Sequence, residues 1–283
     1  MKVIGVIGSG QMGSGIAQVA AQSGFEVVLH DIQKELVEKG LSNIEKNLNR
    51  LVEKGKLSAD QKTSALKNIQ ISTDLASMKN VDLVIEAATE NVEIKLNIFK
   101  TLDGICKPST IFCSNTSSIS ITKIASTTKR PDKVVGLHFM NPVPVMKLVE
   151  VIKGLLTSEE TYKTAVELAG KMGKETVTSL DSPGFLVNRV LCPMINEAVC
   201  ALESGIATAE DIDKAMKLGT NQPMGPLELA DFIGLDTVLA IMEVLHQGFG
   251  EDKFRPSPLL RKYVTAGLLG RKSGRGFFNY GNH

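Results

Sequence analysis

The apolar positions of the chain follow two patterns that alternate from Lys2 to about Ser179. Short runs rich in valine and isoleucine are typical of strands, and the longer segments between them have the apolar spacing of helices. Strands that alternate with helices in this way are typical of a parallel sheet joined by crossover helices. The clearest strands are predicted at residues 3–7, 27–30, 81–87, 110–114 and 134–138.

The connection between the second and third predicted strands is longer than one crossover helix. Within residues 35–68, apolar side chains recur at steps of 4, 3, 4 and 3, which places them on one face of a helix. They are Val37, Leu41, Ile44, Leu48 and Leu51. Gly55 interrupts this pattern, and a capping-box sequence at residues 58–61 starts another helix. We therefore expect a helical hairpin inserted into the sheet domain.

The strand pattern stops after Ser182-Pro183-Gly184. Beyond it, apolar residues have helical spacing and are interrupted by glycine and proline. The expected fold class is α/β, with a mostly parallel sheet and its helical insertion over residues 1–184. An all-α domain is expected over residues 185–283.

Composition excludes several classes of partner. The chain has 283 residues, with 32 Lys and Arg against 31 Asp and Glu, so its net charge of +1 gives no general field that would attract nucleic acid or an anionic membrane. No apolar run approaches the roughly 20 residues of a membrane span, and Met1 runs almost directly into a glycine cluster, without room for a secretory signal. The four cysteines lack metal-binding or disulfide spacing. We expect a cytoplasmic protein with reduced thiols and no metal.

A glycine-rich turn directly follows the first predicted strand and opens a helix. Residues 8–13 have the pattern G-x-G-x-x-G. The first glycine permits a tight bend, the second lets the backbone approach a pyrophosphate, and the third allows the helix to pack closely on the strand. The pattern predicts a Rossmann-type dinucleotide site, and the alternative is a plain strand-to-helix turn. The residues assigned to the cofactor here are Gly8, Gly10, Gln11, Met12 and Gly13.

An acidic residue lies where this motif requires one. Asp31 ends the second predicted strand, 18 positions beyond Gly13, and can accept hydrogen bonds from the adenosine ribose. Its charge would repel the 2′-phosphate of NADP, so NAD is the expected cofactor. NADP stays open because the neighbouring Gln33 and Lys34 could tolerate a further phosphate.

One histidine has the position of a catalytic base. Oxidation of a secondary alcohol needs a group that accepts the hydroxyl proton, and His138 ends an apolar strand at the carboxyl edge of the expected sheet. Twelve residues later, Glu150 lies in a strand-like apolar run, where a carboxylate is costly unless paired. We predict that the two side chains meet; the alternative is a solvated glutamate on an edge strand beside a structural histidine. The histidines interpreted as structural or exposed are His30, His246 and His283.

Six motifs occur in the order typical of one enzyme family. They are Gly8-x-Gly10-x-x-Gly13, Asn115-Thr116-Ser117-Ser118, His138-Phe139-Met140-Asn141-Pro142, Leu148-Val149-Glu150-Val151, Pro183-Gly184-Phe185-Leu186-Val187-Asn188-Arg189 and Gly225-Pro226-Leu227. Over essentially the whole chain they resemble the 3-hydroxyacyl-CoA dehydrogenase family. The length and overall run are similar to its bacterial 3-hydroxybutyryl-CoA dehydrogenase branch.

The resemblance implies a role for each residue at the chemical centre. It makes His138 the general acid and base, and Glu150 the group that orients and polarises it. It places Ser117 on the substrate hydroxyl and the cofactor ribose, and Asn188 on the acyl group and the imidazole. Without the resemblance, residues 115–118 would be interpreted as a polar turn or helix cap.

The resemblance also places four residues beside the cofactor. Glu90 and Lys95 fall near the nicotinamide-side ribose, and Asn115 and Asn141 fall next to the cofactor. On sequence alone, Glu90 would be an acid at a helix start and Lys95 a solvated lysine.

Binding of CoA requires local positive charge, because CoA carries several phosphates and the chain is nearly neutral. The helical insertion contains Arg50, Lys54 and Lys56 within two turns, and the resemblance assigns Lys54 to the CoA nucleotide. The alternative is an ordinary solvated helix face, since acidic residues are interleaved.

The helical region has more apolar positions than a domain of about 100 residues hides alone, and members of the family dimerise through it. We therefore expect a homodimer or a higher homo-oligomer. The resemblance implies interconversion of (S)-3-hydroxybutyryl-CoA and acetoacetyl-CoA with NAD(H), in fatty acid or butyrate metabolism. Two alternatives stay open: a hydroxyacid dehydrogenase that uses a lysine on a free acid, and a non-catalytic NAD-binding protein. The latter would be expected to lack His138 or Glu150, and both are present.

Overall fold

The computed structural model describes residues 1–281. Contacts within the chain divide it into two compact units, Met1–Ser182 and Pro183–His283. His283, which was interpreted as structural or exposed, lies outside the described residues.

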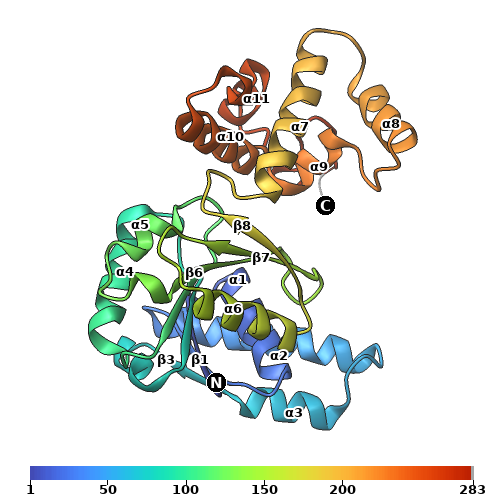
Figure 1. Ribbon diagram of the computed structural model, residues 1–283. Helices are drawn as coiled ribbons and strands as arrows, with labels where there is room; N and C mark the ends of the chain where they lie inside the picture. Colours follow the sequence, from blue (N-terminus) through green and yellow to red (C-terminus); the bar gives the residue numbers. More distant parts are fainter. Residues whose placement is uncertain (282–283) are drawn as a thin grey trace. The chain divides into compact units, whose positions relative to one another are not determined.

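The first unit is an eight-stranded sheet covered by helices (Figure 1), with the strand order β3-β2-β1-β4-β5-β6-β7-β8. All neighbouring strands are parallel except β6 and β7. The strands are β1 Val3–Ile7, β2 Glu26–His30, β3 Ile69–Ser72, β4 Leu83–Glu86, β5 Ile111–Ser114, β6 Val134–Phe139, β7 Leu148–Lys153 and β8 Glu175–Leu180. The helices are α1 Gln11–Gln22, α2 Lys34–Glu53, α3 Ala59–Lys67, α4 Val92–Ile105, α5 Ile121–Ala125 and α6 Glu159–Lys171. The prediction of a mostly parallel Rossmann-type sheet is confirmed.

The central strands are apolar at consecutive positions because both of their faces are covered. All four residues of β4 and all six of β6 are buried. Two polar side chains, Glu86 and His138, lie among them near the carboxyl ends of these strands. Burial of such groups requires partners, which the site supplies.

The predicted helical hairpin consists of α2 and α3. The buried face of α2 contains Val37, Ile44 and Leu48, as its spacing predicted, and α3 begins at the predicted capping box. A Cβ atom on Gly40 of α2 would lie 2.8 Å from the Cβ atom and the carbonyl oxygen of Ser9. The glycine therefore lets α2 approach the turn after β1. The hairpin thus forms one side of the space in front of that turn.

The strand order changes direction at β1, which pairs with β2 on one side and β4 on the other. The chain connections therefore leave this edge in opposite directions, and a crevice opens beyond the carboxyl ends of the two strands. The glycine-rich turn lies at this crevice.

The second unit is helical, as expected, with α7 Val187–Glu203, α8 Ala209–Gly219, α9 Pro226–Ile233, α10 Leu235–Phe249 and α11 Pro258–Thr265. Its core includes Ile195, Leu227 and Leu260, each fully buried. Near its end, Asp231 accepts hydrogen bonds from the amides of Phe277 and Phe278 at 3.0 and 2.9 Å. This carboxylate anchors the last described segment, and burial raises its pKa above the usual range.

No helix formed by residues 1–281 is long and apolar enough to cross a membrane. Within the same residues, no group of three or more histidine, cysteine, aspartate or glutamate side chains has a metal-binding arrangement.

Candidate active site

The turn after β1 has the geometry that its glycines predicted. Gly8 has a φ of +93°, where a side chain would be strained, and a Cβ atom on it would lie 2.6 Å from the carbonyl oxygen of Ala87. A Cβ atom on Gly13 would lie 1.8 Å from the carbonyl oxygen of Gly8. Gly10, by contrast, faces open space. It is the N-cap of α1, whose first turn has no side-chain cap, so the first amides of the helix are available to bind an anionic group.

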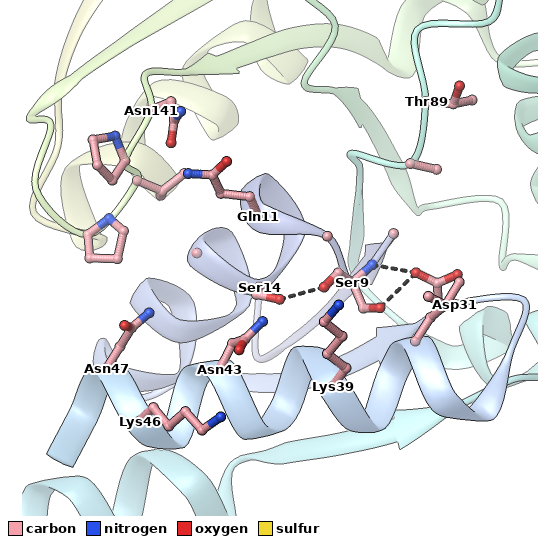
Figure 2. Close-up of a pocket in the computed structure, with 18 of the residues that line it drawn as sticks. Ser9, Gln11, Ser14, Asp31, Lys39, Asn43, Lys46, Asn47, Thr89 and Asn141 are labelled. Carbon is pink, nitrogen blue, oxygen red and sulfur yellow. Dashed lines mark hydrogen bonds between the residues drawn. The ribbon is translucent and has the colours of Figure 1, made fainter. Parts of the chain in front are cut away.

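Asp31 is held in place by the same turn. Its Oδ2 atom accepts hydrogen bonds from the amide and the hydroxyl of Ser9, both at 2.7 Å, and its Oδ1 atom accepts from the amide of Ile32 at 2.8 Å. Figure 2 shows the two Ser9 bonds beside the pocket. Ser9 was not among the predicted residues, since position 9 is variable in the motif and the serine partner becomes visible only when β1 and β2 lie side by side.

A pocket of about 850 Å³ opens at this edge of the sheet. It is lined by residues 8–11, by Asp31 and Ile32, by one face of α2, and by residues 141–144. Lys39, Asn43, Lys46 and Asn47 of α2 line this pocket, and Figure 2 shows them following one another along the helix. The combination of available amides, an oriented carboxylate and basic side chains fits the pyrophosphate and ribose of a dinucleotide.

The predicted nucleotide-binding residues differ in their distance from this pocket. Arg50 and Asn141 line it. Lys54 is the C-cap residue of α2 and is exposed, as is Lys56 just beyond it. Their contact with a CoA nucleotide stays a prediction.

His138 and Glu150 form a buried pair. They lie directly opposite each other in the antiparallel register of β6 and β7, and the Nδ1 atom of His138 is 2.6 Å from the Oε2 atom of Glu150. His138 is 6% exposed and Glu150 is fully buried. Because β7 also pairs with β8, Glu150 is on an interior strand, not on the solvated edge strand of the alternative interpretation.

Asn115 fixes the backbone beside this pair. Its Oδ1 atom accepts a hydrogen bond from the amide of Phe139 at 2.9 Å, and Phe139 directly follows His138 in β6. The asparagine is 7% exposed. It therefore links the end of β5 to the end of β6, where the candidate base lies.

Glu90 organises the turn that contains Ser117. Its carboxylate accepts hydrogen bonds from the amide of Ser117 at 2.8 Å and from the hydroxyl of Thr116 at 2.7 Å. The helix that follows is capped by Asn91 instead, whose side chain accepts from the amide of Ile94. Glu90 is thus a bridge between two loops, in contrast to the helix-start acid that sequence alone suggested.

Lys95 is also not the solvated residue that sequence alone suggested. It is 1% exposed, and its amino group forms an ion pair with the fully buried Glu86. Glu86 was not predicted as a site residue. The available signal was the same as for Glu150, a carboxylate within an apolar run.

Asn188 lies in the first turn of α7, in the second unit. Before this helix begins at Val187, the backbone takes positive φ values at Gly184 (+72°) and Phe185 (+50°). The approach of Asn188 to His138 stays a prediction from the resemblance.

The dinucleotide-binding sheet, followed by a helical domain, defines a two-domain NAD-dependent oxidoreductase. Two family models match the chain: the NAD-binding domain of 3-hydroxyacyl-CoA dehydrogenase over residues 3–182 and its C-terminal domain over residues 184–280. The chain belongs to the 3-hydroxyacyl-CoA dehydrogenase family.

Individual relatives agree with this assignment. The chain is 59% identical to a probable 3-hydroxybutyryl-CoA dehydrogenase of Bacillus subtilis, over 99% of this chain and 98% of the relative. It is 47% identical to the mitochondrial hydroxyacyl-coenzyme A dehydrogenase of Homo sapiens, over 99% and 91%. Among solved structures, (S)-3-hydroxybutyryl-CoA dehydrogenase of Ralstonia eutropha superposes with a TM-score of 0.98 at 52% identity, over 100% of both chains.

Proposed function

We propose that this protein interconverts (S)-3-hydroxybutyryl-CoA, or a similarly short 3-hydroxyacyl-CoA, and acetoacetyl-CoA by hydride transfer with NAD(H). The observation that carries the proposal is the buried hydrogen bond of 2.6 Å between His138 and Glu150, which supports proton transfer at a defined imidazole. Relatives at 52–59% identity whose names specify 3-hydroxybutyryl-CoA support the substrate.

In the direction of oxidation, His138 accepts the proton of the 3-hydroxyl group. Because its Nδ1 atom is engaged with Glu150, the proton arrives at Nε2. Glu150 stabilises the imidazolium that results, since it places a carboxylate against the new charge in a site with little water. NAD⁺, when bound, supplies the acceptor for the hydride that leaves C3. In reduction, protonated His138 returns the proton to the 3-keto oxygen.

The remaining predicted residues are assigned to positioning and binding. Ser117 is proposed to donate to the substrate oxygen and the ribose, and Asn188 to hold the acyl group. Glu90 ties the loop after β4 to the loop after β5, and Asn115 ties the loop after β5 to the end of β6, which supports a fixed seat for the nicotinamide half. Asn141, on the wall of the pocket, completes the cofactor contacts.

We assign NAD as the cofactor over NADP on the orientation of Asp31. A carboxylate held by three donors keeps its charge toward the ribose hydroxyls, where a 2′-phosphate would be repelled. The phosphates of CoA are assigned to the basic residues Arg50, Lys54 and Lys56 at the end of α2.

A homodimer formed through the second unit and a cytoplasmic role in fatty acid or butyrate metabolism are proposed with the activity. Large apolar side chains are exposed on this unit, including Val190 at 64%, Ile206 at 78% and Leu218 at 77%. A second copy would bury such side chains. Light scattering at micromolar concentration tests this, and a monomer would contradict it.

The direct test of function is acetoacetyl-CoA with NADH, followed at the nicotinamide absorbance. We expect oxidation of NADH by the wild-type protein and a loss of roughly 10²- to 10⁴-fold in His138→Gln. No oxidation above background would refute the proposal. Turnover of acetoacetate itself, unaffected by His138→Gln, would instead favour a dehydrogenase of free acids.

A further inference from the structure

Glu86 forms the centre of a buried network that no motif predicted. It is the last residue of β4 and is fully buried. Its carboxylate accepts a hydrogen bond from the hydroxyl of Ser114 at 3.0 Å and one from the amide of Ala88 at 2.9 Å, and it forms an ion pair with Lys95. Four acceptor positions on one carboxylate make this possible, whereas a glutamine has one acceptor oxygen.

Two of these donors lie where the loops with the proposed nicotinamide-side residues begin, and the third, Lys95, lies in α4. Ala88 lies in the loop from β4 to α4, two residues before Glu90. Ser114 ends β5 and directly precedes Asn115, and its hydroxyl accepts from the amide of Thr116 at 3.3 Å. Glu86 therefore joins both loops at their roots, where they leave the sheet.

A second carboxylate joins the same loops further from the sheet. Glu90 accepts from the amide of Ser117 and the hydroxyl of Thr116. Because Glu86 joins the two loops next to the sheet and Glu90 joins them further from it, neither loop can shift easily without the other. Removal of the Glu86 carboxylate would release the first residues of each loop, although the contacts of Glu90 would keep their hydrogen-bonding groups.

Stability gives no sufficient reason for this ion pair. Burial of two charges costs desolvation energy, and apolar residues of similar volume are often equally or more stable in such places. The pair also lies at the crevice, since Glu86 is paired with Ile7 in the sheet register, directly before Gly8. A charged network at this point has the features of a device that orients the loops.

We propose that Glu86 is a positioning residue for the nicotinamide half of the cofactor. It does not touch the cofactor. It acts through Glu90 and the loop at residues 114–117. It leaves unaffected the adenine half, which is assigned to Asp31 just after β2, on the other side of β1. The proposal rests on the proposed function only for the identity of the cofactor.

The same strand offers a matched control. Asp82, just before β4, also pairs with a lysine, Lys107, at 2.6 Å and accepts from the amides of Lys2 and Val3. It lies at the opposite end of the strand from the crevice. Asp82→Asn therefore removes a lysine-paired carboxylate, 29% exposed where that of Glu86 is fully buried, without disturbing either loop.

The experiment measures the dissociation constants of NADH and of ADP by calorimetry for the wild-type protein, Glu86→Gln and Asp82→Asn. ADP reports the adenine half alone. We expect Glu86→Gln to weaken NADH about 10-fold and ADP less than about 2-fold, because only the nicotinamide seat is displaced. Asp82→Asn should leave both constants unchanged.

Equal weakening of NADH and ADP in Glu86→Gln would overturn the proposal, since it would indicate a general structural role. Unchanged NADH binding would overturn it as well. If Glu86→Gln does not fold, Ser114→Ala, which removes one of the two loop contacts, is tested in its place. The increase in its NADH dissociation constant is then compared with the increase in its ADP dissociation constant in the same way. A wild-type protein that binds NADH but does not reduce acetoacetyl-CoA would refute the function and leave this inference standing.

Discussion

Replacement of Glu150 by glutamine tests the core of the mechanism, because it removes a charge and keeps the shape. The amide oxygen can still accept from the Nδ1 atom of His138 at the position where Oε2 now lies, 2.6 Å away. What is lost is the attraction between a carboxylate and the imidazolium that forms during oxidation.

The size of the loss follows from Coulomb's law. For charge centres roughly 4 Å apart at an effective dielectric constant of about 20, the attraction is about 4 kcal/mol. A charge-assisted hydrogen bond contributes about 1.5–3 kcal/mol by mutational measures. Between about 2 and 4 kcal/mol, kcat should fall roughly 30- to 1,000-fold, at about 1.4 kcal/mol per tenfold. The KM for (S)-3-hydroxybutyryl-CoA should change less than about 3-fold, since the imidazolium charge develops only in the transition state of oxidation.

The assay is steady-state oxidation of (S)-3-hydroxybutyryl-CoA with NAD⁺, with Glu175→Gln as the control. Glu175 is a carboxylate on the neighbouring strand β8 whose side chain is 79% exposed, so its variant should have the kcat of the wild type. Because Glu150 acts through His138, the double variant should be no slower than His138→Gln. A kcat of Glu150→Gln within about 3-fold of the wild-type value would refute the reasoning.

Three further outcomes are expected. Ser9→Ala removes one of the two Ser9 bonds to Asp31, so the NADH dissociation constant should rise roughly 3- to 10-fold. The preference of the protein for NADH over NADPH should become smaller, and calorimetry that found this preference unchanged would contradict the prediction. Gly13→Ala forces a Cβ atom against the carbonyl of Gly8, so the melting temperature should fall by roughly 2–12 °C, which calorimetry checks against an Ala substitution at an open glycine position. Burial alone would raise the pKa of Asp82, but its lysine partner and two amides lower this pKa from 3.8 to about 2. The carboxylate therefore contributes its full stability above pH 3.8 and loses it as the pH falls through about 2. The free energy of unfolding by urea should accordingly differ less between pH 5 and pH 2.5 in Asp82→Asn than in the wild-type protein.

Most of the fold could be predicted because its signals are local. The five predicted strands all occur, since consecutive apolar residues suit a sheet covered on both faces. The hairpin of α2 and α3 followed from apolar spacing and a capping box, which depend only on neighbours along the chain. The weaker strand β8 is largely unburied and lacks such a run, so its place at the sheet edge was not predicted.

The candidate site was predictable to the extent that it lies in contiguous motifs. Gly8 and Gly13 have the conformation and close contacts that their spacing implies, and the pairing of His138 with Glu150 followed from the cost of an unpaired buried carboxylate. Lys95 was placed by resemblance, but its burial against Glu86 was not foreseen. Nothing in the sequence says which buried acid and which lysine will meet.

By itself, the sequence determined the strand and helix periods, the glycine turn and the chemical types at its edge, because each of these depends on residues within a few positions of one another. The tertiary structure alone decided that Ser9 holds Asp31, that Glu90 bridges to Ser117, and that Glu86 joins two loops. These contacts connect residues 22 to 28 positions apart. They arise from the lateral order of parallel strands, which brings distant strand ends to one edge, and that order is set by packing of the whole sheet.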